Sequence, residues 1–243
     1  MSRQGILAVE GLSAWYGAAQ ILYDLTFDVG RGEVVALMGR NGAGKSTTLE
    51  SVMGLIAKRT GNIRFVGEDI SRLEPFQISR RGLGFTPEDR RIFSDLTVME
   101  NLDVGRQDAR TFPDGRAAPS WTPEKLFHLF PNLAEMPHRL GGSMSGGEQQ
   151  MLTVARTLMG NPLLVLLDEP SEGVAPIIVE QMANTILELK QEGLSILLSE
   201  QNMHFAEIVS DRVYILEKGQ IRWHGTMQAL KTETEIQRAF LTV

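Results

Sequence analysis

The sequence of 243 residues contains no cysteine, which excludes a disulfide framework and thiolate metal chemistry. It also has no run of lysine or arginine long enough to follow a phosphate backbone. With a formal net charge of -6, the chain is not expected to bind nucleic acid. The first five residues lack the cationic and apolar regions of a signal peptide, so we expect a cytoplasmic protein.

Long apolar runs are absent as well. The longest, at residues 163–167, is far shorter than the ~20 apolar residues that a membrane-spanning helix needs. Any association with a membrane must therefore come through a protein partner, and we expect at most a peripheral protein on the inner face of the cell membrane.

The pattern of apolar residues predicts an α/β fold with a mixed sheet flanked by helices. Alternating segments predict strands of a partly antiparallel layer, at residues 7–9, 21–27 and 63–66. Continuous apolar runs predict central parallel strands covered by helices on both faces, at residues 34–38, 163–167 and 195–198. A hairpin is expected at residues 213–223.

The length fits one α/β unit with an insertion. Helical periodicity, interrupted by prolines, replaces the strand pattern from about residue 89 to 161. We therefore predict a single domain over residues 1–243. Its nucleotide-binding core comprises residues 1–88 and 162–243, and residues 89–161 form an inserted helical subdomain.

The sequence GRNGAGKST at residues 39–47 is a complete GxxxxGK[ST] phosphate loop, placed between an apolar run and a helical stretch. Glycines leave backbone N–H groups open to phosphate oxygens, and the helix that follows adds its positive end. Lys45 is expected to neutralise the β- and γ-phosphates, and Ser46 to ligate Mg²⁺. The alternative is an ordinary glycine-rich turn. The predicted ATP-binding residues here are Gly39, Arg40, Asn41, Gly42, Ala43, Gly44, Lys45, Ser46 and Thr47.

A second helix with an open N-terminus is predicted at Ser145-Gly146-Gly147-Glu148, where the S-x-x-E spacing is that of a capping box. Capping does not require the two glycines, whereas an anion at the helix start would use the open N–H groups. One bound nucleotide does not require both this helix start and the phosphate loop from the same chain. A symmetric dimer would use both, with the loop of one chain and this helix of the other on the same γ-phosphate. The alternative is a capped helix only.

Two acids, Asp168 and Glu169, follow the buried run at residues 163–167, at the strand end where open α/β sheets bind ligands. Asp168 suits Mg²⁺ coordination, and Glu169 is a candidate to orient or deprotonate the attacking water. The alternative is that these acids cap the next turn.

With these residues in place, the chain resembles the ATP-binding cassettes of ABC transporters over essentially its whole length. The phosphate loop, the signature MSGGEQQ at residues 144–150 and Leu-Leu-Asp-Glu-Pro at 166–170 occur in the order of that family. More narrowly, the chain is similar to the second cassette of branched-chain amino-acid importers. That likeness lies at residues 87–93, 96–102, 172–180 and 199–202.

The resemblance implies further roles. Tyr16 stands where cassettes carry an aromatic that stacks on adenine, although Trp15 could compete for that role. Glu88 stands where a glutamine usually contacts Mg²⁺. Gln201 stands at the position of the switch histidine, where its amide donates a hydrogen bond but carries no proton or charge. His204 is a candidate for a displaced switch.

At Ala175 many cassettes have an aspartate that reaches across the dimer, so that cross-contact is expected to be absent. The resemblance implies ATP and Mg²⁺ as cofactors. The implied partners are a sister cassette in a heterodimer or a homodimer, two membrane permeases and, indirectly, a secreted substrate-binding protein.

The expected function is ATP hydrolysis that powers uptake of branched-chain or other hydrophobic amino acids. Two alternatives come from Gln201 and from the family: an ATP-gated dimerisation module with weak hydrolysis beside a more active sister, and a cassette of a urea or amide importer. Soluble ABC ATPases of translation or DNA repair are a third class. They carry paired cassettes, a coiled-coil insertion or nucleic-acid contacts, none of which this sequence shows.

Overall fold

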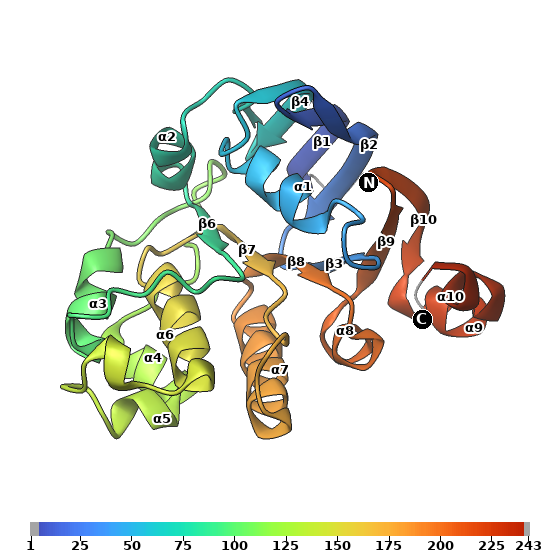
Figure 1. The fold of residues 1–243 in the computed structure, drawn as a ribbon. Coiled ribbons are helices and arrows are strands. Elements are labelled where there is room, and N and C mark those ends of the chain that lie inside the picture. Colours follow the sequence, from blue (N-terminus) through green and yellow to red (C-terminus); the bar gives the residue numbers. More distant parts are fainter. Residues whose placement is uncertain (1–4, 241–243) are drawn as a thin grey trace.

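The computed structural model describes residues 5–240 (Figure 1). The first four residues, part of the segment on which the absence of a signal peptide was argued, lie outside this range. The strands are β1 (Gly5–Tyr16), β2 (Ala19–Gly30), β3 (Val34–Met38), β4 (Lys58–Phe65), β5 (Glu68–Asp69), β6 (Leu83–Thr86), β7 (Leu164–Asp168), β8 (Ser195–Glu200), β9 (Arg212–Glu217) and β10 (Gln220–Thr226). The helices are α1 (Lys45–Val52), α2 (Pro75–Arg80), α3 (Val98–Gly105), α4 (Pro123–Leu129), α5 (Pro131–Ala134), the 3₁₀ turn η1 (Gly141–Ser143), α6 (Gly146–Leu158), α7 (Pro176–Gln191), α8 (Met203–Val209), α9 (Met227–Thr232) and α10 (Thr234–Phe240).

A six-stranded mixed sheet, in the order β10-β9-β3-β8-β7-β6, forms the centre of the molecule. Its strands β9, β3, β8, β7 and β6 are parallel, and β10 pairs antiparallel with β9. Successive residues of β3 enter two different apolar clusters: Val34 and Ala36 pack on one face, and Val35 and Leu37 on the other. The continuous apolar runs of the sequence arise because both faces of these strands are buried.

The two faces of this sheet are covered differently. Helices α6, α7 and α8 contribute many of the buried residues of the first cluster. On the other face, α1 packs together with a second, four-stranded antiparallel sheet of order β2-β1-β4-β5. The α/β fold with an antiparallel layer is thus confirmed. The expectation of helices on both faces of the central strands was incomplete, because a β layer covers much of the second face.

Helices α3, α4, α5 and α6 lie together to one side of the central sheet (Figure 1). The segment between α3 and α4 packs elsewhere. Phe112 is buried in the cluster beneath the antiparallel sheet, and the guanidinium of Arg31 lies 3.2 Å from the centre of its ring. Arg31 also pairs with Asp114 at 2.8 Å. This segment therefore joins the helical region to the turn between β2 and β3.

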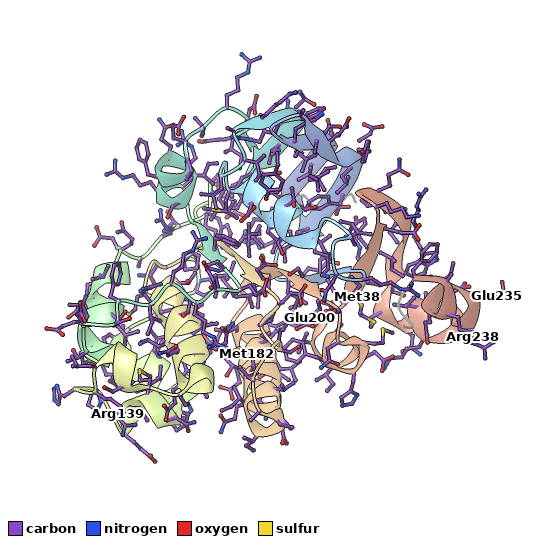
Figure 2. The ribbon with its side chains drawn as sticks, viewed as in Figure 1. Met38, Arg139, Met182, Glu200, Glu235 and Arg238 are labelled. Carbon is purple, nitrogen blue, oxygen red and sulfur yellow. The ribbon has the colours of Figure 1, made fainter. Side chains whose placement is uncertain are left out.

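The interior of the sheet also holds a carboxylate. Figure 2 shows Glu200 and Met38 near the middle of the molecule, whereas Arg139, Glu235 and Arg238 lie at its periphery. Glu200, the last residue of β8, is only 1% exposed. Among residues 5–240, every helix is too short or too polar to cross a lipid bilayer.

Candidate functional site

The loop at residues 39–47 connects β3 to α1 in a shape that requires glycine. A Cβ on Gly39 would overlap the carbonyl oxygen of Leu216, and Gly44 has φ 106 as the N-cap of α1. Only glycine adopts such a backbone readily. The loop therefore turns tightly above the carboxyl end of β3 and leaves the first N–H groups of α1 without a side-chain cap.

Lys45, the first residue of α1, points back across the loop. Its Nζ donates to the carbonyl oxygens of Gly39 at 2.8 Å and Arg40 at 3.3 Å, and it pairs with Glu169 Oε1 at 3.0 Å. Both side chains of the pair are at most 5% exposed. The carbonyl groups of the loop and the carboxylate of Glu169, which directly follows β7, therefore hold the amine of Lys45 in a buried position.

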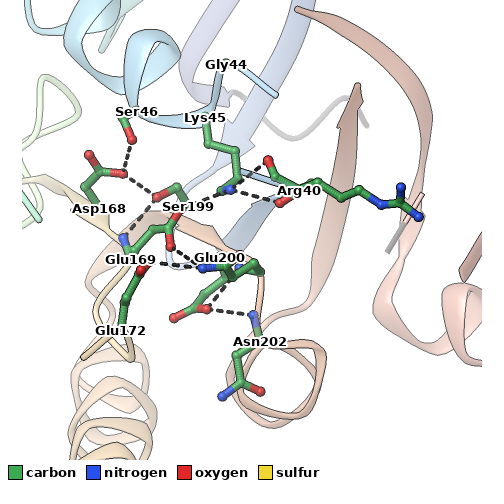
Figure 3. A network of polar contacts seen from close by, with 12 residues as sticks. Arg40, Gly44, Lys45, Ser46, Asp168, Glu169, Glu172, Ser199, Glu200 and Asn202 are labelled. Carbon is green, nitrogen blue, oxygen red and sulfur yellow. Dashed lines mark hydrogen bonds and ion pairs between the residues drawn. The ribbon is translucent and has the colours of Figure 1, made fainter. Parts of the chain in front are cut away.

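Asp168 ends β7 directly beside the phosphate loop (Figure 3). Its Oδ1 accepts hydrogen bonds from Ser46 Oγ at 3.0 Å and from Ser199 Oγ at 2.5 Å. Burial raises the pKa of Asp168, and the two hydroxyl hydrogen bonds oppose that shift. Asp168 and Ser46 bring together the hard oxygen ligands that Mg²⁺ prefers. Residues 5–240 contain no cluster of three or more His, Cys, Asp or Glu suited to a metal ion, so such a cation would need phosphate or water oxygens as well.

Glu169 adopts φ 44, a left-handed conformation that is uncommon for a residue other than glycine. Its backbone N–H donates to Ser199 Oγ at 3.0 Å. Its carboxylate contacts Lys45 through Oε1 and accepts from Gln201 Nε2 through Oε2 at 3.1 Å. The turned backbone therefore aims Glu169 at the phosphate loop rather than along the strand.

Glu172 forms a second carboxylate beside Glu169. Gln201 Nε2 also donates to Glu172 Oε2 at 3.1 Å, so one amide bridges the two acids. The hydrogen bond with Glu169, assisted by partial burial, raises the pKa of Glu172 to about 7. Burial tends to raise the pKa of Glu169 too, but Glu172 and Lys45 outweigh it and hold that pKa below its ordinary value. The two carboxyls titrate as a pair.

Glu200 organises the backbone around this pair. Its Oε1 accepts from the N–H of Ser171 at 3.1 Å, and its Oε2 from the N–H groups of Gln201 at 3.1 Å and Asn202 at 3.0 Å. Burial raises the pKa of Glu200, and these hydrogen bonds to the carboxylate counteract the shift. No role was predicted from the sequence for Glu200, Glu172 or Ser199. The one available signal was that β8 ends in polar residues beside the acids of β7.

The remaining predicted residues on this side surround the loop. The hydroxyl of Tyr16 donates to Glu50 Oε2 on α1 at 2.6 Å, which leaves its ring half exposed beside the phosphate loop. Trp15 instead lies against Lys58. Glu88 is exposed at the end of β6, and its charge contributes to the raised pKa values of Asp168 and Glu172.

The structure also places Ala175, Gln201 and the candidate displaced switch His204. Ala175 is the exposed N-cap of α7. His204 is exposed in the first turn of α8, and Gln201, not His204, contacts the carboxylates. The structure therefore brings Gln201, and not His204, to the two carboxylates.

The predicted capping box at the start of α6 is present. Glu148 N–H donates to Ser145 Oγ at 3.3 Å, and Ser145 N–H donates to Glu148 Oε2 at 2.6 Å. The glycines have a packing reason within the chain as well. A Cβ on Gly146 would lie 2.8 Å from Arg90 Nη1, and one on Gly147 would lie 2.8 Å from Ile178. Among the described residues, no hydrogen bond joins residues 145–148 to the phosphate loop, and Figure 1 shows α1 and α6 in different parts of the molecule.

A phosphate loop on a parallel sheet, with a buried lysine and two acids at the neighbouring strand end, defines a P-loop nucleoside triphosphatase. The chain matches the family model described as ABC transporter over residues 22–172. It belongs to the ATP-binding cassettes of ABC transporters, and it is the subunit that binds and hydrolyses ATP to power transport.

Curated relatives match almost the whole chain. It is 42% identical over 241 residues to the high-affinity branched-chain amino acid transport ATP-binding protein BraG of Pseudomonas aeruginosa, covering 97% of this chain and 99% of the relative. It is 34% identical to the lipopolysaccharide export system ATP-binding protein LptB of Escherichia coli K12, covering 97% and 96%. A probable branched-chain amino acid transport ATP-binding protein LivF of Archaeoglobus fulgidus is 33% identical over 93% of this chain and 94% of its own length.

Solved structures agree with the fold. An ATP-binding cassette of an ABC transporter in its ADP conformation superposes with a TM-score of 0.78 at 27% identity, covering 97% of this chain and 98% of the other. The ATP-binding subunit of another ABC transporter gives a TM-score of 0.78 at 29% identity, with coverage of 97% and 96%.

Proposed function

We propose that this chain powers the uptake of branched-chain or other hydrophobic amino acids. The support for this substrate class is the 42% identity, over nearly the full length of both chains, to a branched-chain amino acid transport protein. A second relative, described as a probable branched-chain amino acid transport ATP-binding protein, comes from Archaeoglobus fulgidus. The observation that carries the activity is the convergence of Lys45, Asp168, Glu169 and Gln201 at the carboxyl ends of three adjacent strands.

Ser46 and Asp168 are the residues that would hold Mg²⁺, since their oxygens lie 3.0 Å apart beside the loop, and Glu88 would approach from the end of β6. Bound there, the ion would neutralise charge on the β- and γ-phosphates. The ring of Tyr16 would stack on adenine, and the backbone N–H groups of residues 39–47 would receive the phosphates.

Lys45 then exchanges its partner. On ATP binding, its Nζ moves from Glu169 Oε1 to a phosphate oxygen, which frees the carboxylate of Glu169. Glu169 orients the attacking water and accepts its proton as the oxygen bonds to phosphorus and the bond to ADP breaks. Gln201 keeps Glu169 oriented through its amide, while Glu172 accepts the second hydrogen bond of that amide.

The signature residues Ser145, Gly146, Gly147 and Glu148 act on the nucleotide of a second cassette. We propose a heterodimer, because Gln201 cannot carry charge at the switch position and Ala175 offers no carboxylate to the partner. The pair would bind two permeases at the inner face of the cell membrane, and a secreted substrate-binding protein would deliver the cargo. Purified alone, this chain should hydrolyse ATP slowly; rapid turnover without a partner would contradict the heterodimer.

Gln201 also favours a second candidate, an ATP-gated clamp in which the sister cassette performs most hydrolysis. The assembled complex separates the two. With Glu169→Gln in this chain alone, a motor that uses both sites loses most of its ATPase activity, whereas a clamp keeps the activity of the sister.

Substrate uptake tests the proposed function directly. The chain should co-purify with two membrane permeases, and cells that lack it should lose uptake of radiolabelled leucine, isoleucine and valine. Restoring Lys45→Ala protein in place of the parent should not recover uptake. Loss of urea or amide uptake with unchanged leucine uptake would contradict the substrate class.

A further inference from the structure

Two consecutive arginines near the end of β6 have an unusual backbone. Arg90 has φ 63 and Arg91 has φ 45, both left-handed, and residues other than glycine adopt this region at a cost in free energy. Side chains of α6 hold both carbonyl groups: Thr153 Oγ1 donates to Arg90 at 2.9 Å, and Arg156 Nη2 donates to Arg91 at 2.7 Å. The segment is therefore fastened to the helix that begins at the signature.

The two arginine side chains diverge from this turn. Arg91 pairs with Asp89 at 2.8 Å and is well exposed. The guanidinium of Arg90 lies against the first residue of α6, since a Cβ on Gly146 would be 2.8 Å from its Nη1. A Cβ on Gly173, in the turn before α7, would be 3.9 Å from its Nη2. Within residues 5–240, the guanidinium of Arg90 makes no hydrogen bond or ion pair.

This placement gives the start of α6 a charge balance suited to phosphate. The capping carboxylate of Glu148 brings a negative charge there, which by itself would repel a triphosphate. The guanidinium beside Gly146 offsets that charge and adds planar donors that match phosphate oxygens. Among the described residues, the chain's own phosphate loop forms no hydrogen bond with residues 145–148 and lies in a different part of the molecule, which favours a phosphate held by another chain.

We propose that Arg90 is a residue of the signature half-site, where its guanidinium binds the γ-phosphate of the ATP held by the phosphate loop of the second cassette. This inference rests on the proposed function, because it requires paired cassettes. Glycine at position 146 fits this role of Arg90, because a Cβ there would displace the guanidinium.

The test uses ATP-dependent association in a Glu169→Gln background, which retains the nucleotide. Sedimentation velocity with ATP and Mg²⁺ would compare Arg90→Ala, Arg90→Lys and Arg91→Ala, each with itself and with the second cassette. Arg91→Ala is the matched control, because it changes the same residue type at the same kind of backbone position. Binding of a fluorescent ATP analogue to the single chain and the melting temperature are measured for each variant.

Arg90→Ala should weaken ATP-dependent association by roughly tenfold or more, the order expected for a lost charge-assisted contact. Arg90→Lys should recover part of it, and Arg91→Ala should change it by less than about twofold. Nucleotide binding to the single chain should be the same in all variants. Association of Arg90→Ala equal to that of the parent, or an equal loss in Arg91→Ala, would overturn the role of Arg90 and leave paired cassettes intact. A parent that fails to associate with itself and with the second cassette would overturn both.

Discussion

The phosphate loop and the start of α6 are the two proposed phosphate-binding regions of this chain. They differ in how many of their charged groups have a partner within the chain. At the phosphate loop, each charged group has a partner: Lys45 pairs with Glu169, and Asp168 accepts from Ser46 and Ser199. At the start of α6, the capping box satisfies its own backbone, but the guanidinium of Arg90 has no acceptor among residues 5–240.

The difference indicates what each region needs. A network of buried, mutually paired groups is stable before the nucleotide arrives and exchanges partners when it binds. A guanidinium without an acceptor in its own chain gains that interaction only from a group outside the chain. We therefore interpret the first region as complete for binding and the second as a half-site that pairing completes.

The largest expected effect comes from a substitution that stops hydrolysis at the phosphate-loop site and leaves the pairing of cassettes through the start of α6 intact. Glu169→Gln removes the proton acceptor, so kcat of the assembled transporter should fall by roughly 10²–10⁴-fold per affected site, while ATP affinity and ATP-dependent pairing persist. Glu180→Gln, an exposed acid on α7, is the control. Steady-state ATPase assays with nucleotide-binding titrations measure this. Unchanged turnover would remove Glu169 from the catalytic role.

A smaller effect is expected at the buried carboxylate that supports the first region. Glu200→Ala leaves the N–H groups of Ser171, Gln201 and Asn202 without their acceptor, so the free energy of unfolding should fall by about 1–3 kcal/mol. Melting temperature should drop by several degrees, and kcat should fall as Gln201 loses its support. Glu200→Gln keeps an acceptor oxygen and should lose less. Glu192→Ala, which is exposed, should change neither quantity; if it matched Glu200→Ala, the proposed backbone role would be wrong.

The smallest effect concerns pH. Because the pKa of Glu172 is raised to about 7 in the folded chain, the proton it holds favours folding below its unfolded pKa, and that contribution is lost as pH rises through about 7. Glu172→Gln removes this dependence. Its melting temperature relative to the parent should therefore increase between pH 5 and pH 8, by roughly 1–2 °C because solvent screens this exposed group. Thermal melts across this range, with Glu180→Gln as control, measure it; a difference that does not vary with pH would contradict the carboxyl pair.

The parts of the site that local sequence encodes could be predicted. The apolar run of β3 followed by the phosphate loop, the spacing of Ser145 and Glu148, and the acids at the end of β7 all depend on residues near one another in the chain. Their geometry follows from strand, turn and capping rules that apply wherever such patterns occur.

The parts of the site that depend on contacts between distant residues could not be predicted. The bond from Ser199 to Asp168 follows from the register of β7 with β8, and Glu200 reaches Ser171 across 29 positions of the sequence. The helical periodicity of residues 89–161 gave no sign that Phe112 would leave that region and pack beneath Arg31. The division of the chain into residues 1–88 with 162–243 and residues 89–161 stays a prediction.

The molecular mass of the Glu169→Gln chain with bound nucleotide tests the central claim most directly. In ATP and Mg²⁺, sedimentation should give the mass of a pair, with itself or with the second cassette, and replacing ATP with ADP should return single chains. A chain that remains single in ATP in both mixtures, although it binds the nucleotide, would contradict a site completed by two protomers.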